Sequence, residues 1–331
     1  MAKNSNFLKL YKKKLTNLQK KHLMHLSLLA LLLISTTSLV TLRQNKDRNE
    51  KPVVVRRVKG ASIQALPTNL PKVPVLNDQV NFPLLSAQAV IVLDVDSGIP
   101  LYEKNPNARF LPASTTKIMT GIVALEHYDL DKELIVERFF VPGQKMNLLP
   151  GEKITVKNLL YGLLIHSAND AAEVLARNYP GGREEFIKQM NIKADELSLS
   201  NTNFQNPSGL DGQAHYSTAR DLVSVAAYAM KKPFFAQVVS TRQKLVTDST
   251  GEIKHNLRNI NELLGKVDGV LGVKTGWTEN ARENLVTYLE RDGNKMMISV
   301  MGSQDRFGET QILIDWVFDN YKWVKIENYS P

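Results

Sequence analysis

The sequence predicts a mixed α/β fold of the α+β type, in which one antiparallel sheet is flanked by helices. Strand-like segments occur near both ends of the folded part, and helical hydrophobic periodicity dominates the residues between them. No internal repeat is present. Strands that are distant in the sequence can pair in one sheet, while the intervening helices form an inserted all-helical lobe. We expect the active site to lie between the sheet and this lobe.

The individual elements follow from local patterns. Residues 87–94 form an apolar run typical of a buried strand, and Asp96-Ser97-Gly98 turns it into 101–103, so we predict a hairpin. A helix is expected from Pro112 to about His127. Further helices are predicted over 156–165, from 170, over 184–197, 217–231 and 309–321, and strands over 243–246, 252–257, 272–276, 284–290 and 295–302.

The N-terminal region has the pattern of a membrane anchor. Residues 1–22 are polar and basic, whereas residues 23–42 are apolar and contain no Asp, Glu, Lys or Arg. Twenty residues rise about 30 Å as a helix, which matches the hydrocarbon core of a bilayer. We predict a cytoplasmic tail (1–22), a single transmembrane helix (23–42) and an extracytoplasmic remainder. A cleaved signal, which would make the protein secreted, is less favoured because 38–42 lacks a small-x-small end.

Residues 43–86 are predicted to be a linker, and 87–331 the catalytic domain. The linker contains five of the 14 prolines and shows no sustained period. The net charge of +9 comes from the first 85 residues, with 15 Lys/Arg against 3 Asp/Glu, whereas the other 246 hold 27 against 30. No nucleic-acid partner is therefore expected. The lack of cysteine excludes disulfides, thiol catalysis and a lipoprotein anchor.

Ser114 and Lys117 form a candidate nucleophile and base. Side chains three residues apart on a helix share one face, so the hydroxyl and the amine can touch. A serine hydroxyl is a poor nucleophile until a base takes its proton, and Lys117 is placed to do so. A lysine base must be neutral near pH 7, which requires burial or a neighbouring cation such as Lys274.

Two further motifs accompany this pair. Ser167-Ala168-Asn169 lies in a break between predicted helices, and Lys274-Thr275-Gly276 lies in a predicted strand. The glycine would let a substrate backbone approach closely. Each motif alone could be a capping serine, a loop asparagine or an edge-strand lysine. All three in this order, each occurring once, indicate a site.

The chain resembles the serine D-alanyl-D-alanine carboxypeptidases, which are penicillin-binding proteins of low molecular mass with a β-lactamase/transpeptidase-like fold. The resemblance covers about residues 87–318. It includes the three motifs and the stretches 113–120, 150–156, 206–211 and 215–222.

The resemblance implies a role for each motif residue. Ser114 would be the acylated nucleophile, Lys117 its base, and Ser167 the relay that protonates the departing D-alanine. Asn169 would help hold the substrate backbone. The last motif would bind the terminal carboxylate through Lys274 and Thr275, with Gly276 beside the substrate. Backbone N–H groups of Ser114 and Trp277 would form the oxyanion hole.

Four positions depart from the pattern of the family. His166 replaces a proline or small residue, and Arg282 and Asn284 replace a glycine and a cysteine. Trp277 stands where tyrosine or histidine is common. We expect these differences to alter the rim of the cleft and the substrate preference rather than the chemistry.

The function that follows is removal of the terminal D-Ala from peptidoglycan stem peptides, with covalent inhibition by β-lactams and no metal or cofactor. A D,D-endopeptidase of cross-links and an inactive wall-binding module remain alternatives. A β-lactamase is less expected, because no Glu-x-x-Leu-Asn segment follows residues 167–169. The six histidines show no His-Glu-x-x-His spacing, and His215 is expected to be structural.

Overall fold

The computed structural model describes residues 72–77 and 80–325. The predicted cytoplasmic tail (1–22) and transmembrane helix (23–42) lie outside the described residues. Within the described ranges, none of the helices combines the length and the apolar character needed to cross a bilayer.

A five-stranded antiparallel sheet forms the centre of the domain, in the order β3-β2-β10-β9-β8. β2 comes from the start of the domain and pairs with β10 from its end, with Val92 opposite Ile298. The sheet is therefore assembled from distant segments, as predicted. Its strands are β2 (Ala89–Asp94), β3 (Pro100–Lys104), β8 (Val270–Thr278), β9 (Arg282–Arg291) and β10 (Asn294–Ser303).

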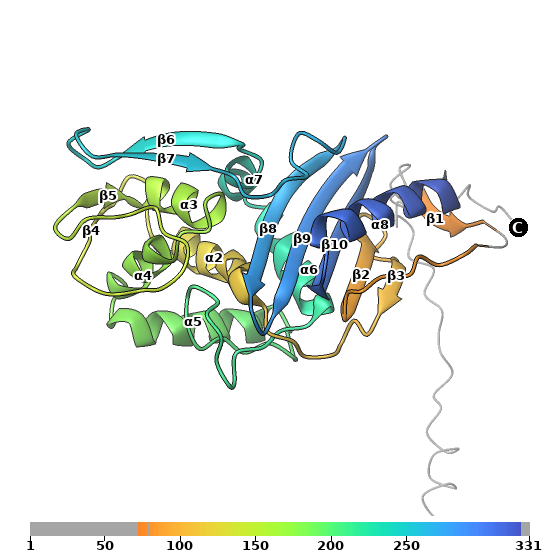
Figure 1. Cartoon of the computed structure of the whole chain (residues 1–331), viewed down its shortest axis with the longest axis horizontal. Helices are drawn as coiled ribbons and strands as arrows, with labels where there is room; N and C mark the ends of the chain where they lie inside the picture. The colour runs from red at the N-terminus through yellow and green to blue at the C-terminus, as the bar shows by residue number, and fades with distance from the viewer. Residues whose placement is uncertain (1–71, 78–79, 326–331) are drawn as a thin grey trace, which may run out of the picture. The chain divides into compact units, whose positions relative to one another are not determined.

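Helices cover both faces of this sheet (Figure 1). On the central strands, successive side chains point to opposite faces. Ile91 and Met297 belong to the core shared with the helical lobe, whereas Val92 and Ile298 pack with α8. The helices are η1 (Ala113–Thr116), α2 (Lys117–His127), α3 (Val156–Leu164), α4 (Asn169–Arg177), α5 (Gly182–Glu196), α6 (Ala219–Met230), α7 (Pro233–Val239) and α8 (Arg306–Asn320).

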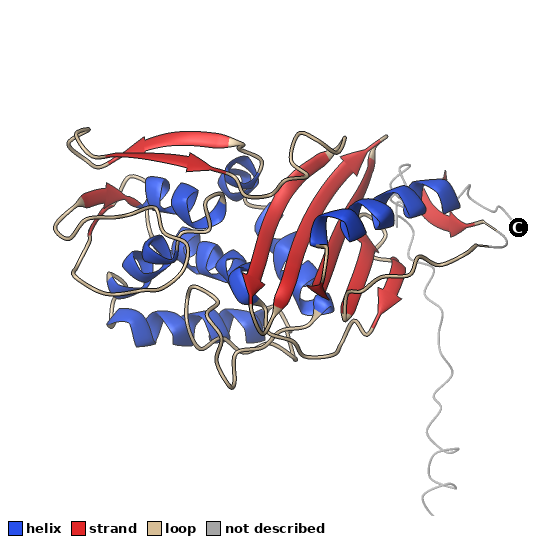
Figure 2. Cartoon of the chain, in the orientation of Figure 1, coloured by secondary structure: helices blue, strands red, loops and turns tan. Residues whose placement is uncertain are grey.

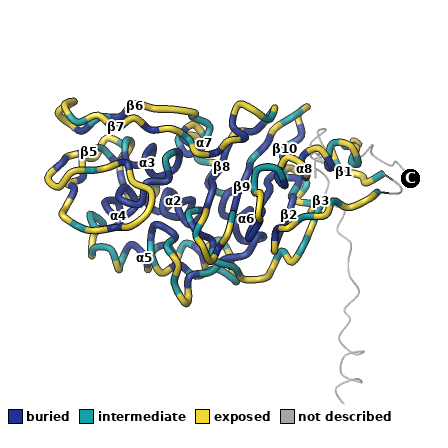
Figure 3. The backbone as a smooth tube through the Cα atoms, viewed as in Figure 1, coloured by how far each residue is buried: buried dark blue, intermediate teal, exposed yellow. Residues whose placement is uncertain are grey.

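The helical lobe is built around α2. Every residue from Lys117 to Ala124 is buried, and α3 to α6 surround this helix (Figures 2 and 3). Two short antiparallel pairs lie on the lobe, namely β4 (Glu133–Ile135) with β5 (Lys153–Thr155), and β6 (Gln243–Thr247) with β7 (Lys254–Arg258). The β4–β5 pair and α7 were not predicted, because three to seven residues carry too little periodicity.

One boundary of the predicted linker is wrong. Residues Lys72–Leu76, inside the predicted 43–86 linker, form β1 and pair with β11 (Tyr321–Lys325). Pro74 is tolerated because β1 has a single partner strand. Phe82 then packs against Trp316, with ring centroids 5.3 Å apart. The folded domain therefore begins before Ala87.

Candidate active site

Ser114 lies in a 3₁₀ turn that leads directly into α2. The predicted single helix from Pro112 is thus two elements, η1 and α2, of which the second ends at His127 as expected. In a 3₁₀ turn, side chains at i and i+3 eclipse each other. This geometry places the Lys117 Nζ atom 2.9 Å from the Ser114 Oγ atom. The nucleophile and its candidate base are therefore in direct contact.

The amine of Lys117 is completely buried and has two further neighbours. Its Nζ atom donates to Asn169 Oδ1 at 2.7 Å and to the Ser208 carbonyl oxygen at 2.5 Å. Burial lowers the pKa of Lys117 to about 7, against a smaller opposing effect of the Asp170 carboxylate. A neutral amine has two N–H groups and one lone pair. Because both neighbouring oxygens only accept, the lone pair is left for the Ser114 hydroxyl proton.

The segment 206–210 presents the Ser208 carbonyl to Lys117. The side-chain oxygen of Asn206 accepts from the backbone N–H groups of Gly209, at 2.7 Å, and Leu210, at 3.0 Å. A Cβ at Gly209, whose φ is +84°, would lie only 1.9 Å from the Ala113 carbonyl oxygen. This close approach beside the nucleophile explains the glycine in a stretch that the sequence marked only by resemblance.

Ser167 and Lys274 form a second hydrogen-bonded pair. Ser167 lies between α3 and α4 with a φ of +61°, and the Lys274 Nζ atom donates to its Oγ atom at 2.9 Å. Lys274 is buried to 1% exposure. Burial, followed by the positive charges of Lys117 and Arg306, lowers the pKa of Lys274 well below its usual range. Burial, one of the two predicted causes, has the largest effect on the pKa of both amines, and the charge of Lys274 is not among the causes of the shift of Lys117.

A cavity of about 550 Å³ lies between the sheet edge and the helical lobe. It is lined by most of the predicted site residues, namely Ser114, Ser167, Asn169, Thr275, Gly276 and Trp277. Lys117 and Lys274 reach it through the hydroxyls of Ser114 and Ser167. A Cβ at Gly276 would lie 3.1 Å from the Ser114 backbone nitrogen, so the glycine lets β8 run close to the nucleophile.

Both polar atoms of the Asn169 side-chain amide form hydrogen bonds. Its Oδ1 atom accepts from Lys117, and its Nδ2 atom donates to the Pro142 carbonyl oxygen at 2.7 Å. Its backbone N–H donates to the Gln144 carbonyl at 2.8 Å. In this structure Asn169 therefore positions the base and the 142–144 segment that borders the cavity.

Sequence reasoning missed Arg306, which begins α8 and lines the cavity. Its Nη1 atom donates to the Gly276 carbonyl oxygen at 3.0 Å. The preceding residue, Asp305, caps α8 by accepting from the Gly308 N–H at 2.9 Å. A capping Asp marks a helix start, but nothing in the local sequence indicates that the next arginine faces a cleft about 190 residues from Ser114 in the chain.

Three of the four family departures do not line the cavity, although His166 contacts Gln144, which does. Asn284 is fully buried, where it donates to the Leu111 carbonyl at 2.9 Å and accepts from the Gly302 N–H at 2.8 Å. Arg282 starts β9 with a φ of +58° and, like Asn284, does not line the cavity. The expectation that these two residues alter the rim is therefore wrong. Trp277 lines the cavity with 61% of its surface exposed.

The histidines near the site serve as supports. His166 lies 2.9 Å from the Gln144 side-chain nitrogen through its Nε2 atom. Buried His215 accepts from the Gln205 N–H through Nδ1, which leaves Nε2–H to donate to the Thr116 hydroxyl at 2.8 Å. Burial lowers the pKa of His215 to about 4. The imidazole is thus neutral near pH 7, in line with the expected structural role.

A serine in contact with a buried amine, a second serine–lysine pair and one cavity lined by both serines define a serine enzyme of the acyl-transfer class. A family profile described as D-alanyl-D-alanine carboxypeptidase matches residues 77–305. The chain belongs to this family.

Individual relatives agree with this assignment. D-alanyl-D-alanine carboxypeptidase DacF of Bacillus subtilis is 35% identical over 246 residues, which cover 71% of this chain and 63% of DacF. A D-alanyl-D-alanine endopeptidase of Pseudomonas aeruginosa is 33% identical over 241 residues, or 70% of this chain and 77% of that protein. The crystal structure of the Streptomyces K15 DD-transpeptidase superposes with a TM-score of 0.69 at 32% identity, covering 72% of this chain and all of that chain.

Proposed function

We propose that this protein is a D-alanyl-D-alanine carboxypeptidase that hydrolyses the terminal peptide bond of peptidoglycan stem peptides through an acyl-enzyme on Ser114. The observation that carries the proposal is the buried amine of Lys117, whose pKa is about 7 and which lies 2.9 Å from the Ser114 hydroxyl. An amine with this pKa is half neutral at pH 7, so it can accept the hydroxyl proton.

Acylation begins when Lys117 takes the proton of Ser114 and the Oγ atom bonds to the scissile carbonyl carbon. Negative charge then develops on the carbonyl oxygen, where the backbone N–H groups of Ser114 and Trp277 would stabilise it. One such donor is worth about 3–4 kcal/mol. The carbon–nitrogen bond breaks as Ser167, which accepts a hydrogen bond from Lys274, gives its hydroxyl proton to the departing amine of D-alanine. The proton that Lys117 took from Ser114 is passed on to Ser167, which leaves the Lys117 amine neutral for the next step.

The terminal carboxylate of the substrate would lie at the β8 side of the cavity. Thr275 supplies a hydroxyl there and Arg306 a guanidinium group, and a carboxylate bound beside them would favour the protonated form of buried Lys274. Water then attacks the ester carbon with Lys117 again as base, and the Ser114 Oγ atom leaves with the returned proton. This sequence releases the shortened peptide and restores the enzyme.

Labelling of the full chain with a fluorescent penicillin tests the assignment, together with release of D-alanine from a peptide that ends in D-Ala-D-Ala. We expect one covalent adduct on Ser114, and loss of both adduct and D-alanine release in Ser114→Ala. Ser240→Ala, at the half-buried C-cap of α7, is the matched control and should keep both. A folded wild-type protein that forms no adduct would refute the proposal.

Two alternatives keep the same cleft. A D,D-endopeptidase would cut a cross-linked peptide dimer faster than a linear pentapeptide, so the ratio of the two rates separates the activities. An inactive wall-binding module would bind peptidoglycan equally well with or without the Ser114 hydroxyl, and it would release no D-alanine.

The predicted topology belongs to the same proposal. Residues 23–42 would anchor the chain in the cytoplasmic membrane, with 1–22 inside the cell and the catalytic domain on the wall side. The support is the uncharged apolar run of 20 residues. Membrane fractionation of the full chain should place the penicillin-labelled protein in the pellet, and deletion of 23–42 should remove it from there. Labelled wild-type protein of reduced length in the supernatant would indicate a cleaved signal instead.

A further inference from the structure

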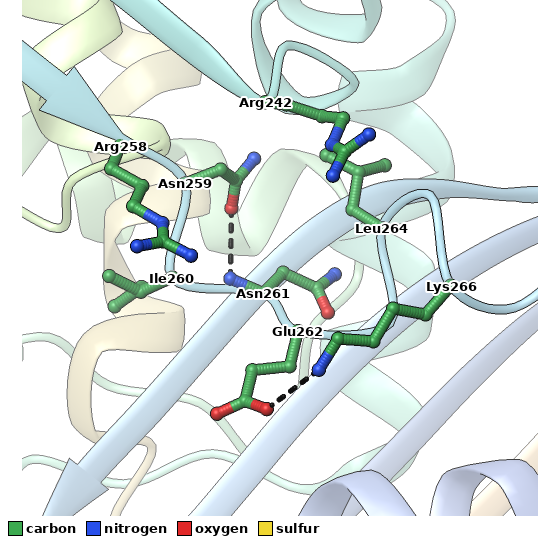
Figure 4. A pocket seen from close by; sticks show the side chains of 8 residues that line it. All are labelled: Arg242, Arg258, Asn259, Ile260, Asn261, Glu262, Leu264 and Lys266. Carbon is green, nitrogen blue, oxygen red and sulfur yellow. Dashed lines mark hydrogen bonds and ion pairs between the residues drawn. The ribbon is translucent and has the colours of Figure 1, made fainter.

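A second cavity of about 460 Å³ adjoins the catalytic cleft. It is formed by the residue before β6, the end of β7, and the segment that leads from β7 towards β8 (Figure 4). Ile260 lines both this cavity and the catalytic one, so the two are neighbours across a single residue. The other lining residues are Arg242, Arg258, Asn259, Asn261, Glu262, Leu264 and Lys266.

The charge of this second cavity is positive and partly uncompensated. Glu262 pairs with Lys266, with 3.1 Å between Oε2 and Nζ. Arg242 and Arg258 form no ion pair with any carboxylate in the described part of the chain, and no interaction reaches either guanidinium in Figure 4. Two guanidinium groups therefore face this cavity without a counter-charge from the residues that the structure describes.

The backbone around these side chains is fixed. The backbone carbonyl of Arg242 accepts from the Asn259 N–H at 2.8 Å, and the Asn259 amide donates to the carbonyls of Val239 and Thr241. The Arg242 guanidinium lies against Gly265, where an added Cβ would be 3.2 Å from its Cζ atom. The second cavity is thus built on a hydrogen-bonded frame rather than on a free loop.

Asn261 adds a donor that has no acceptor. Its side chain lines the second cavity and the residue is only 4% exposed. The Oδ1 atom accepts from the Leu263 N–H at 3.1 Å, which fixes the orientation of the amide. The Nδ2 atom is buried and finds no partner among the described residues. A buried N–H group without an acceptor is costly, and a small shift of the amide towards the second cavity would let this donor meet a ligand oxygen.

We propose that the second cavity binds a carboxylate carried by the peptide substrate upstream of the scissile bond. This inference rests on the proposed function and extends it to a recognition site. Guanidinium groups bind carboxylates through paired, charge-assisted hydrogen bonds, and the Asn261 amide supplies a further N–H.

Two contacts connect the lining of the second cavity to the segment that carries Ser167. The Ile260 N–H donates to the carbonyl of Ile165 at 3.1 Å, two residues before Ser167. The Arg258 carbonyl lies 3.3 Å from the Nδ1 atom of His166. A carboxylate held beside Arg258 would therefore fix the peptide relative to the segment that carries Ser167.

A pair of synthetic peptides tests this proposal on the full chain. Both end in Lys-D-Ala-D-Ala and carry an upstream γ-linked glutamyl residue, whose α-carboxyl group is free in one and a carboxamide in the other. Release of D-alanine gives kcat/KM for each. We expect the free acid to be preferred by about tenfold, the worth of a charge-assisted hydrogen bond. The preference should fall to near one in the double variant Arg242→Gln/Arg258→Gln.

Controls separate this inference from the proposed function. Lys254→Gln removes one charge from the same hairpin outside the second cavity and should keep the preference. Acylation by penicillin, which carries no such residue, should be equal in wild type and variants. Equal cleavage of both peptides by the wild type, or a preference that survives in the double variant, would overturn the carboxylate site alone. Failure of both penicillin labelling and peptide cleavage would instead refute the proposed function.

Discussion

Replacement of Asn169 by aspartate should move the pH dependence of acylation. The Asn169 Oδ1 atom accepts from the buried Lys117 amine at 2.7 Å, so Asn169→Asp places a carboxylate against the candidate base. The new charge would stabilise the ammonium form and raise the pKa of Lys117 above its present value of about 7. Since only the neutral amine can take the Ser114 proton, the alkaline shift should slow acylation at neutral pH.

The size of the shift follows from the geometry. At 2.7 Å, two opposite charges attract by about 6 kcal/mol for an effective dielectric constant of about 20. Desolvation of the new carboxylate removes several kcal/mol, so a rise of about 2 in the pKa of Lys117 is a moderate value. The neutral fraction of the amine at pH 7 would then fall from about half to about 1%, which is roughly a 50-fold loss in rate.

The assay is the second-order rate of penicillin acylation, measured from about pH 6 to about pH 10. In the wild type the rate should rise with pH through about 7, and in Asn169→Asp the same rise should occur near pH 9, with most of the rate recovered above it. Asn169→Ala is the control, because it removes the same hydrogen bonds without adding charge. A profile of Asn169→Asp that coincides with that of Asn169→Ala would refute Lys117 as the titrating base.

Two other substitutions, Gly276→Ala and His255→Gln, test contacts at the nucleophile and in the fold around the site. Gly276→Ala places a Cβ 3.1 Å from the Ser114 backbone nitrogen and should slow acylation about a hundredfold, the cost of disturbing an oxyanion donor; a penicillin rate within twofold of wild type would contradict this. His255 pairs with buried Glu152 at 2.7 Å, and this contact raises the pKa of His255. The pair therefore contributes its full stabilisation below about pH 6.5, the ordinary pKa of histidine in an unfolded chain. This stabilisation is lost as the pH rises through the higher pKa of His255 in the folded protein. Urea unfolding should show a loss of about 3 kcal/mol for His255→Gln near pH 6 and a smaller loss near pH 9; an equal loss at both would exclude the ion pair.

The parts of the site that the sequence predicted are those whose chemistry is local. Ser114 and Lys117 touch because they are three residues apart on one turn, and this spacing is visible without a structure. The contact between Ser167 and Lys274 spans 107 residues, so only the resemblance to a family could bring these two together. The strands of the central sheet could be predicted from local patterns, since β2 and the middle of β10 are apolar runs.

The parts that were missed depend on tertiary contacts without a local signal. The Ser208 carbonyl that fixes the Lys117 amine is a backbone group, so no pattern of side chains in the sequence predicts its role. Asn284 was assigned to the rim because it replaces a cysteine that is usual in the family. In the structure its side chain is buried, and its amide joins Leu111 to Gly302. The prolines in 43–86 indicated a linker over the whole segment. β1 was therefore missed, because its partner β11 is about 250 residues away and leaves no local signal.

The pairing of β1 with β11 brings the two ends of the described domain to one point, where Lys72 lies opposite Lys325 (Figure 1). A few residues of linker would close the polypeptide into a ring there, and the exposed Asp292–Gly293 turn offers a place to reopen it. Such a circular permutant would begin with β10 and end with β9, so that Lys274 came near the new C-terminus while Ser114, Ser167 and Lys274 kept their order and the sheet register stayed the same. A permutant that still takes up penicillin would demonstrate that the cleft depends on packing and not on where the chain starts.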